Sequence, residues 1–84
     1  MDAAKLTAQR ARIKVVKLRT WASWGTSSEY EPLRLFKEIE KDPKCNWILR
    51  DSGRVEKNPK GVEYYNQHIR QSKLPEEEKQ ELFI

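Results

Sequence analysis

The sequence predicts a small α+β fold with a short strand, two helices, a β-hairpin and a C-terminal helix. Its 84 residues have room for one domain with a thin core. Apolar residues recur at helical spacing before residue 42 and again after residue 61. Between these stretches, an aliphatic run, an Asp-Ser-Gly turn and a β-branched run over residues 46–57 are typical of a hairpin.

The first quarter of the chain is expected to hold a strand and the first helix. Residues 1–12 form either a short helix or a mobile basic arm. The β-branched run Ile13-Lys-Val-Val16 predicts a brief strand. The stretch from Leu18 to Trp24 has helical spacing, and Gly25 is a natural C-terminal stop for that helix.

A second helix is expected to follow and to end at Asp42, because the residue before Pro43 avoids the helical region. The sequence allows two starting points for this helix. If Ser28 is the N-cap, Glu31 follows three residues later, as in a capping box; a helix that begins near Pro32 has the proline in its first turn. The residues expected on the inner side are Leu33, Phe36, Ile39 and Glu40. The residues expected on the opposite face are Tyr30, Arg34, Lys37 and Lys41.

The second half of the chain is expected to form the hairpin and two more helices. The hairpin turns at Ser52-Gly53, and Val62 to Gln71 resumes helical spacing. Pro75, followed by three glutamates, favours a last helix, since acidic residues suit its positive N-terminal end. We therefore divide the chain into a basic extension (1–12), a central domain (13–72) and an acidic helical tail (73–84).

Several classes of protein are excluded or disfavoured by composition. No apolar run approaches the ~20 residues of a membrane span, and no apolar core of a secretion signal begins the chain. The single cysteine, Cys45, excludes a disulfide framework and favours a reducing compartment. Nothing in the sequence orients Cys45 and His68 as a nucleophile pair, and no phosphate loop or metal motif occurs. We therefore expect no enzyme activity, no cofactor and no metal.

The distribution of charge points to a polyanion as the partner. The net charge is +4, and it is concentrated in two basic blocks: residues 1–24 sum to +5 and residues 43–60 to +3. Two such blocks separated by a mixed segment favour two contact regions on DNA. The three tryptophans are expected in the core rather than on bases, with Trp47 packed beneath the helices.

Two helices joined by a tight turn and followed by a basic hairpin are the layout of a winged helix-turn-helix. The chain resembles the small excisionases of phages and conjugative transposons, winged-helix proteins related to the MerR group. The resemblance rests on Lys17-Leu-Arg-Thr-Trp-Ala22, Leu33-Arg-Leu-Phe-Lys-Glu38, Asn46-Trp-Ile-Leu-Arg-Asp-Ser-Gly-Arg-Val55 and Val62-Glu-Tyr-Tyr65. It spans roughly residues 13–71. It departs from the family at Leu35, where a second arginine is common.

The resemblance implies a non-enzymatic protein that binds and bends double-stranded DNA in the cytoplasm of a bacterial host cell. Several copies would bind cooperatively, contact a tyrosine recombinase (integrase), and promote excisive site-specific recombination. The second helix would enter the major groove and the hairpin would be the wing. The expected DNA-binding residues are Ser27, Ser28, Tyr30, Arg34, Lys37, Lys41, Arg50, Ser52, Arg54 and Lys57.

Two alternatives stay open at the level of sequence. A transcriptional regulator of a mobile element would have the same fold and bind DNA in the same way. A small basic subunit of a ribonucleoprotein or respiratory assembly would have similar charge and aromatic content, but its helices would pack on neighbouring subunits. Cooperative folding of the isolated chain distinguishes this second alternative from a DNA-binding domain.

Overall fold

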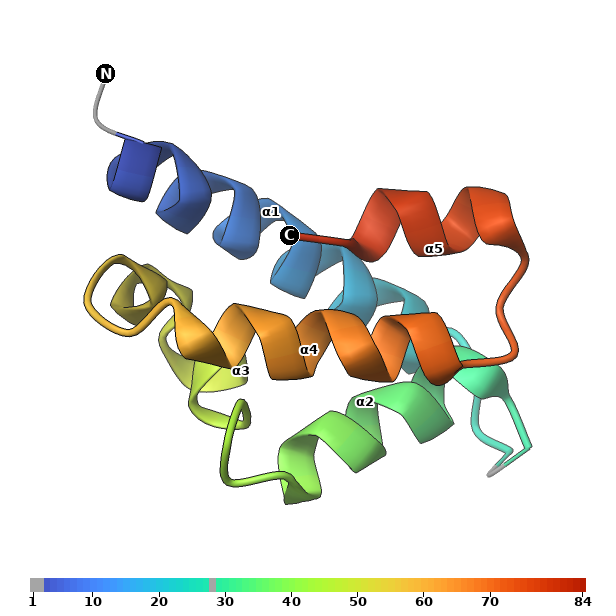
Figure 1. Cartoon of the computed structure of the whole chain (residues 1–84). Coiled ribbons are helices and arrows are strands. Elements are labelled where there is room, and N and C mark those ends of the chain that lie inside the picture. Colours follow the sequence, from blue (N-terminus) through green and yellow to red (C-terminus); the bar gives the residue numbers. More distant parts are fainter. Residues whose placement is uncertain (1–2, 28) are drawn as a thin grey trace.

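A computed structural model describes residues 3–27 and 29–84 (Figure 1). In this part of the chain the regular secondary structure consists of helices, which turns and short loops connect. The elements are α1 (Ala3–Ser23), α2 (Glu31–Lys41), α3 (Trp47–Arg50), the 3-10 helix η1 (Ser52–Glu56), α4 (Lys60–Gln71) and α5 (Glu76–Leu82). No strand occurs in the described part of the chain. The predicted α+β winged helix-turn-helix, with its strand and hairpin wing, is therefore wrong.

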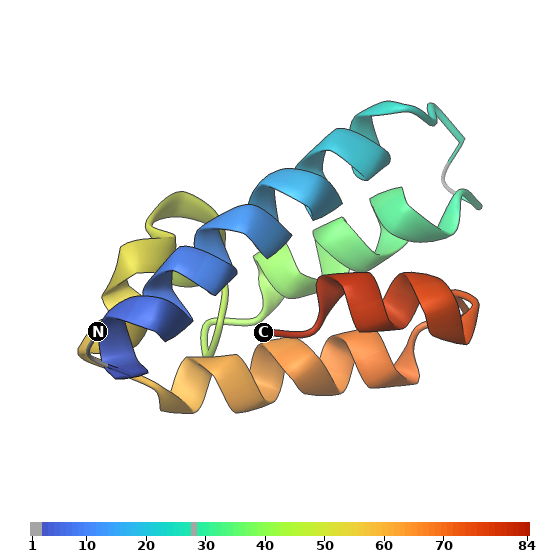
Figure 2. The same cartoon turned by 90° about the horizontal axis from the view of Figure 1, so that it is seen from above.

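The helices surround one core. Figure 2 shows α1 and α4 on opposite sides of the molecule, with α2 and α5 between them. The short elements α3 and η1 pack against α1 near its N-terminal half, and α5 packs against both α1 and α4. The fully buried side chains come from every part of the fold: Leu18, Leu35, Ile39, Cys45, Ile48, Val55, Tyr65, Ile69 and Leu82.

Helix α1 replaces the predicted strand at residues 13–16 and passes through residues 12 and 13 without a break. Its inner side consists of Ala11, Val15, Leu18 and Ala22, which recur at spacings of four, three and four. Only Val15 of the β-branched run lies on that side, whereas Ile13 and Val16 are 61% and 58% exposed. Helix-favouring Ala, Leu, Lys, Arg and Gln on both sides outweigh the weak β preference of three residues.

The predicted hairpin at residues 46–57 is replaced by α3 and η1. Adjacent Ile48 and Leu49 are both buried, whereas successive residues of a strand point to opposite faces. The backbone bonds are local: the N–H of Asp51 donates to the carbonyl of Trp47 at 2.9 Å. Gly53 does not have a positive φ, which the tight hairpin turns require at their central positions. The Asp-Ser-Gly sequence here starts a helical turn instead.

The helix predicted before Asp42 is confirmed as α2, which has Pro32 in its first turn and ends at Lys41. Its inner side differs from the prediction. Leu35 and Ile39 are buried, while Leu33 and Phe36 are half-buried and Glu40 is exposed. The helices expected at residues 62–71 and after Pro75 are also confirmed, as α4 and α5.

Gly25 permits a close approach in the turn between α1 and α2. A Cβ atom at this position would overlap the ring of Tyr30. Gly25 does not have the positive φ of a left-handed helix cap. Its importance therefore lies in the space it leaves for the tyrosine, which is the residue that precedes α2.

The C-terminal segment docks on α4. The amide of Ile84 donates to the side-chain oxygen of Asn66 at 3.0 Å, and the ammonium of Lys79 donates to the carbonyl of Arg70 at 2.9 Å. Leu82 is fully buried in the same region. None of the described helices combines the length and the apolar character that crossing a bilayer requires.

Candidate nucleic-acid interface

The outer side of α1 is the most strongly basic surface of an element in this fold. This helix contains six of the chain's seventeen Lys and Arg residues and none of its thirteen Asp and Glu residues. The six are Lys5, Arg10, Arg12, Lys14, Lys17 and Arg19. Since α1 alone carries more positive charge than the net charge of +4, the rest of the chain is slightly acidic.

Helical spacing distributes these cations on two flanks. Lys5, Arg12 and Arg19 are seven residues apart, so they lie nearly in line along one side of α1. Arg10, Lys14 and Lys17 lie on the other side. The strip between the two flanks contains the exposed apolar residues Leu6, Ile13 and Val16, and the exposed Trp24 follows the end of the helix. Trp24 is 70% exposed, which contradicts its expected place in the core.

The cations of α1 have no acidic partner within the described residues, where the ion pairs join Arg34 to Glu38 and His68 to Asp42. Two of them contact aromatic rings or carbonyls instead. The Lys17 ammonium lies 6.0 Å from the ring centroid of Trp21. The Arg19 guanidinium donates to the carbonyl of Leu49 and lies 6.0 Å from the centroid of Phe36. Arg19 therefore helps to hold α1, α2 and α3 together. The other five cations make no such hydrogen bond within the described residues, and Lys5, Arg10 and Arg12 among them are exposed.

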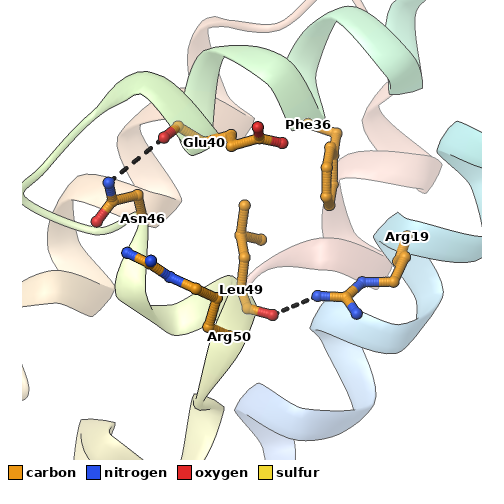
Figure 3. A pocket seen from close by; sticks show the side chains of 6 residues that line it. All are labelled: Arg19, Phe36, Glu40, Asn46, Leu49 and Arg50. Carbon is orange, nitrogen blue, oxygen red and sulfur yellow. Dashed lines mark hydrogen bonds between the residues drawn. The ribbon is translucent and has the colours of Figure 1, made fainter.

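An open pocket of about 450 Å³ lies where α1, α2 and α3 meet (Figure 3). Its lining consists of Arg19, Phe36, Glu40, Asn46, Leu49 and Arg50. Figure 3 shows Arg19 pointing to the Leu49 carbonyl while Arg50 extends along the other side toward Asn46. The Glu40 carboxylate points toward Phe36 on the α2 side of the pocket (Figure 3), so the lining combines both signs of charge and is a poor site for a single anion.

The predicted residues on α2 keep their exposed position, although the fold around them differs. Lys37 and Lys41 are exposed, and Arg34 pairs with Glu38 at 3.4 Å. Tyr30 lies against Gly25, and Ser27 accepts a hydrogen bond from the amide of Glu29 at 3.2 Å. Ser28, both as a DNA contact and as a capping residue, lies outside the described residues.

The predicted wing residues belong to α3 and η1 and form no protruding loop. Arg50 ends α3 and Ser52 begins η1. The Arg54 guanidinium lies 5.4 Å from the centroid of the Trp47 ring, and Lys57 is exposed just after η1. The structure therefore places these four side chains on a packed helical segment, and it does not join them to the α2 group in one site.

Asp42, Cys45 and His68 form a separate cluster at the end of α2, and their ligating atoms all lie within 4.8 Å of one another. The His68 Nε2 atom is 2.9 Å from the Asp42 carboxylate. The hydrogen bond from His68 and the one from the Lys44 amide lower the pKa of Asp42. Burial, with a further contribution from Asp42, raises the pKa of the Cys45 thiol to about 12. Of the described residues, only these three form a group that could hold a metal ion.

The contacts of Asp42 predict a loss of stability in acid. Its pKa is lowered in the folded state from the ordinary value of 3.8, so its contribution is complete above that value and disappears as the pH falls through the lower, folded pKa. We expect Asp42→Asn to be less stable than the original chain near neutral pH. Urea unfolding at a series of pH values should show this difference shrinking below about pH 4. A difference that stays constant with pH would contradict this origin.

Comparisons of the chain with protein-family models, curated proteins and solved structures find no match.

The sequence predicted the basic block over residues 1–24 as one of two DNA-contact regions, but it placed a strand in this block and named no DNA-binding residue from it. The single helix that carries these cations is a feature that only the structure shows. A helical wheel drawn over residues 3–23 groups the four buried residues of the inner side, but it places Leu6, Ile13 and Val16 on the opposite side, so apolar spacing alone does not single out the inner side. No comparable signal marks the cluster of Asp42, Cys45 and His68, because His68 lies 26 residues after Asp42.

Proposed function

We propose that the protein binds duplex DNA through the outer side of α1. The single observation that supports this proposal is the charge of the helix, with six cations and no acidic residue over 21 positions. Phosphate contacts by Lys and Arg provide most of the affinity of non-specific DNA binding. A helix with this charge attracts a polyanion along its whole length, which is about 31 Å at 1.5 Å per residue.

The two-flank arrangement fits a helix lying in a major groove. The groove is about 12 Å wide and admits one α-helix between two phosphate backbones. Arg10 on one flank and Arg12 on the other would face opposite backbones. Ile13 and Val16, which lie between the flanks and are more than half exposed, offer the apolar surface that contacts thymine methyl groups. The buried inner side of α1 would anchor the helix to its domain during binding.

The packing of the chain favours a self-contained domain over a subunit that wraps its neighbours. Each of four helices contributes a side chain that is 0% exposed: Leu18 from α1, Ile39 from α2, Ile69 from α4 and Leu82 from α5. In a subunit that wraps its neighbours, such residues would be exposed in the isolated chain and buried only against the partner subunits. DNA bending, cooperative binding, an integrase partner and a regulatory role in a mobile element stay predictions within this proposal. The DNA contacts expected from Arg34 and Arg54 stay predictions outside it, because neither residue lies on α1.

Removing two cations from α1 should weaken DNA binding strongly. We expect the double variant Arg10→Gln/Arg12→Gln to bind random duplex roughly 10- to 100-fold more weakly at 0.1 M salt, because each phosphate contact contributes close to one factor of ten there. For the original chain, phosphate contacts by the five cations of α1 other than Arg19 predict a slope of log K against log salt of about −4 to −5. In the double variant this slope should be shallower by about two units, because two phosphate contacts are lost. Fluorescence anisotropy over a salt series measures both quantities.

The matched control is Lys37→Gln/Lys41→Gln, which removes the same charge from α2. It should leave binding within a few-fold of the original chain. If this control loses more affinity than the α1 variant, α2 is the interface and the proposal is wrong for α1. If both variants keep the original affinity and helical circular dichroism, or if the original chain binds no duplex at low salt, DNA is not the partner.

A further inference from the structure

The cluster at the end of α2 has the composition of a transition-metal site. It offers a thiol sulfur, an imidazole nitrogen and a carboxylate oxygen, which are the three donor types found around zinc in proteins. Asp42 and Cys45 are three residues apart in one turn, and His68 comes from the facing side of α4. The three atoms thus converge from two segments that the core already holds together.

The distances fit a small metal ion after slight adjustment. With bonds of about 2.0–2.3 Å, the ligands of a tetrahedral zinc ion lie roughly 3.3–3.7 Å apart. The three atoms now lie within 4.8 Å of one another, and His68 Nε2 and Asp42 Oδ2 are separated by 2.9 Å. Side-chain movements of about 1 Å would bring all three ligand atoms to bonding distance from one ion.

The surroundings hold the ligands in place. The Lys44 amide donates to Oδ1 of Asp42 at 3.0 Å, which leaves Oδ2 directed to His68. Such outer hydrogen bonds orient metal ligands in known sites. The Asp42 and His68 side chains are 21% and 22% exposed, so an ion can enter from solvent, while Cys45 closes the inner side at 0% exposure.

One buried group in the same part of the core lacks a partner. The hydroxyl of Tyr65, one helical turn before His68, is buried and has no hydrogen bond. Burial raises the pKa of Tyr65, and Cys45 raises it further. A buried hydroxyl without a partner is costly. A thiolate at Cys45 would be a far better acceptor for it than the neutral thiol.

Nucleophilic catalysis is a poor use of this cluster. A reactive cysteine needs a low pKa and access, whereas Cys45 is fully buried and its pKa is raised to about 12. A metal ion changes this situation because it replaces the thiol proton, which passes to water.

We propose that Asp42, Cys45 and His68 bind a divalent transition-metal ion of the zinc type, with solvent water in the fourth position. The ion would bridge the turn after α2 to the last turn of α4. This inference is independent of DNA binding, because the cluster shares no residue with α1.

Cobalt(II) is the probe, because a cobalt–thiolate bond produces an absorption band that carboxylate or imidazole ligands alone do not. Titration of the purified full chain with Co²⁺ should produce this band with one equivalent bound, and Zn²⁺ should abolish it. Cys45→Ser should eliminate the band, and His68→Gln should weaken Co²⁺ binding at least tenfold. The control Glu63→Gln, which removes an exposed carboxylate of α4, should match the original chain.

A second readout keeps the test decisive if Cys45→Ser does not fold. Zn²⁺ should raise the melting temperature of the original chain by several degrees, since ligands that bind only the folded state stabilise it. It should not raise that of His68→Gln, whose side chain is partly exposed. Absence of the thiolate band in the original chain, or equal Co²⁺ affinity in His68→Gln, overturns the proposal.

Discussion

Tyr65→Ala is expected to lower the free energy of unfolding by about 3–5 kcal/mol, as truncation of large buried aromatic residues does. Tyr65 is 0% exposed and is the largest of the fully buried side chains. A domain of this size has a total stability of only about 5–15 kcal/mol, so much of the protein should unfold at moderate temperature. Chemical denaturation followed by circular dichroism measures the change.

Tyr65→Phe is the matched control, and it should behave in the opposite way. It keeps the ring in the core and removes the hydroxyl, which has no hydrogen-bond partner. Because an unsatisfied buried polar group costs about 1–3 kcal/mol, the phenylalanine variant should be as stable as the original chain or more stable. A variant that loses as much stability as Tyr65→Ala would show that the hydroxyl is satisfied in solution.

Trp47→Ala should cost about 3 kcal/mol, at the lower end for aromatic truncation because Trp47 is only half-buried. This side chain connects three parts of the fold. Its Nε1 donates to the carbonyl of Lys44 at 3.2 Å, Arg54 lies over its ring, and Gly61 of α4 lies beneath it. Thermal unfolding should therefore show a clearly lower midpoint. An unchanged midpoint would mean that Trp47 does not pack on α4.

Gly61→Ala tests the same contact from the other side. A Cβ atom at Gly61 would overlap the six-membered ring of Trp47, so the ring must move. Overpacking of this kind costs roughly 1–3 kcal/mol. In the Trp47→Ala background the same substitution should cost much less, because the clashing ring is gone, and a double-mutant cycle measures this coupling. Additive costs would show that the two residues do not touch.

Local sequence determined the helices with a clear amphipathic period. Leu35 and Ile39 repeat at helical spacing in α2, and Pro43 ends that helix because the preceding residue cannot remain helical. The same reasoning holds for α4, where Tyr65 and Ile69 are both buried. These signals lie within one turn of the helix and depend little on distant residues.

The segments that were predicted wrongly are those in which local preference is weak. At Ile13 to Val16, β-branched residues favour a strand only slightly, and the helix-favouring residues on both sides outweigh this preference. The helix then buries Val15 and leaves Ile13 and Val16 exposed. At residues 46–57, the apolar residues fit either a strand or a buried turn of helix. Burial of adjacent Ile48 and Leu49 selects the helical form, and that burial depends on packing against α1.

The sequence by itself determined that this protein is basic in its first 24 residues, and this charge still carries the proposed DNA contact. Only the tertiary structure decided which side of that segment is exposed, because burying Leu18 and Ala22 turns the cations outward. It alone decided that Asp42 and Cys45 meet His68, since side chains so far apart in sequence are brought together by the packing of α2 on α4. The charge of a segment is the sum of the charges of its residues, so it follows from the sequence alone. A site depends on the distances between side chains, and the packing of the whole core sets these distances.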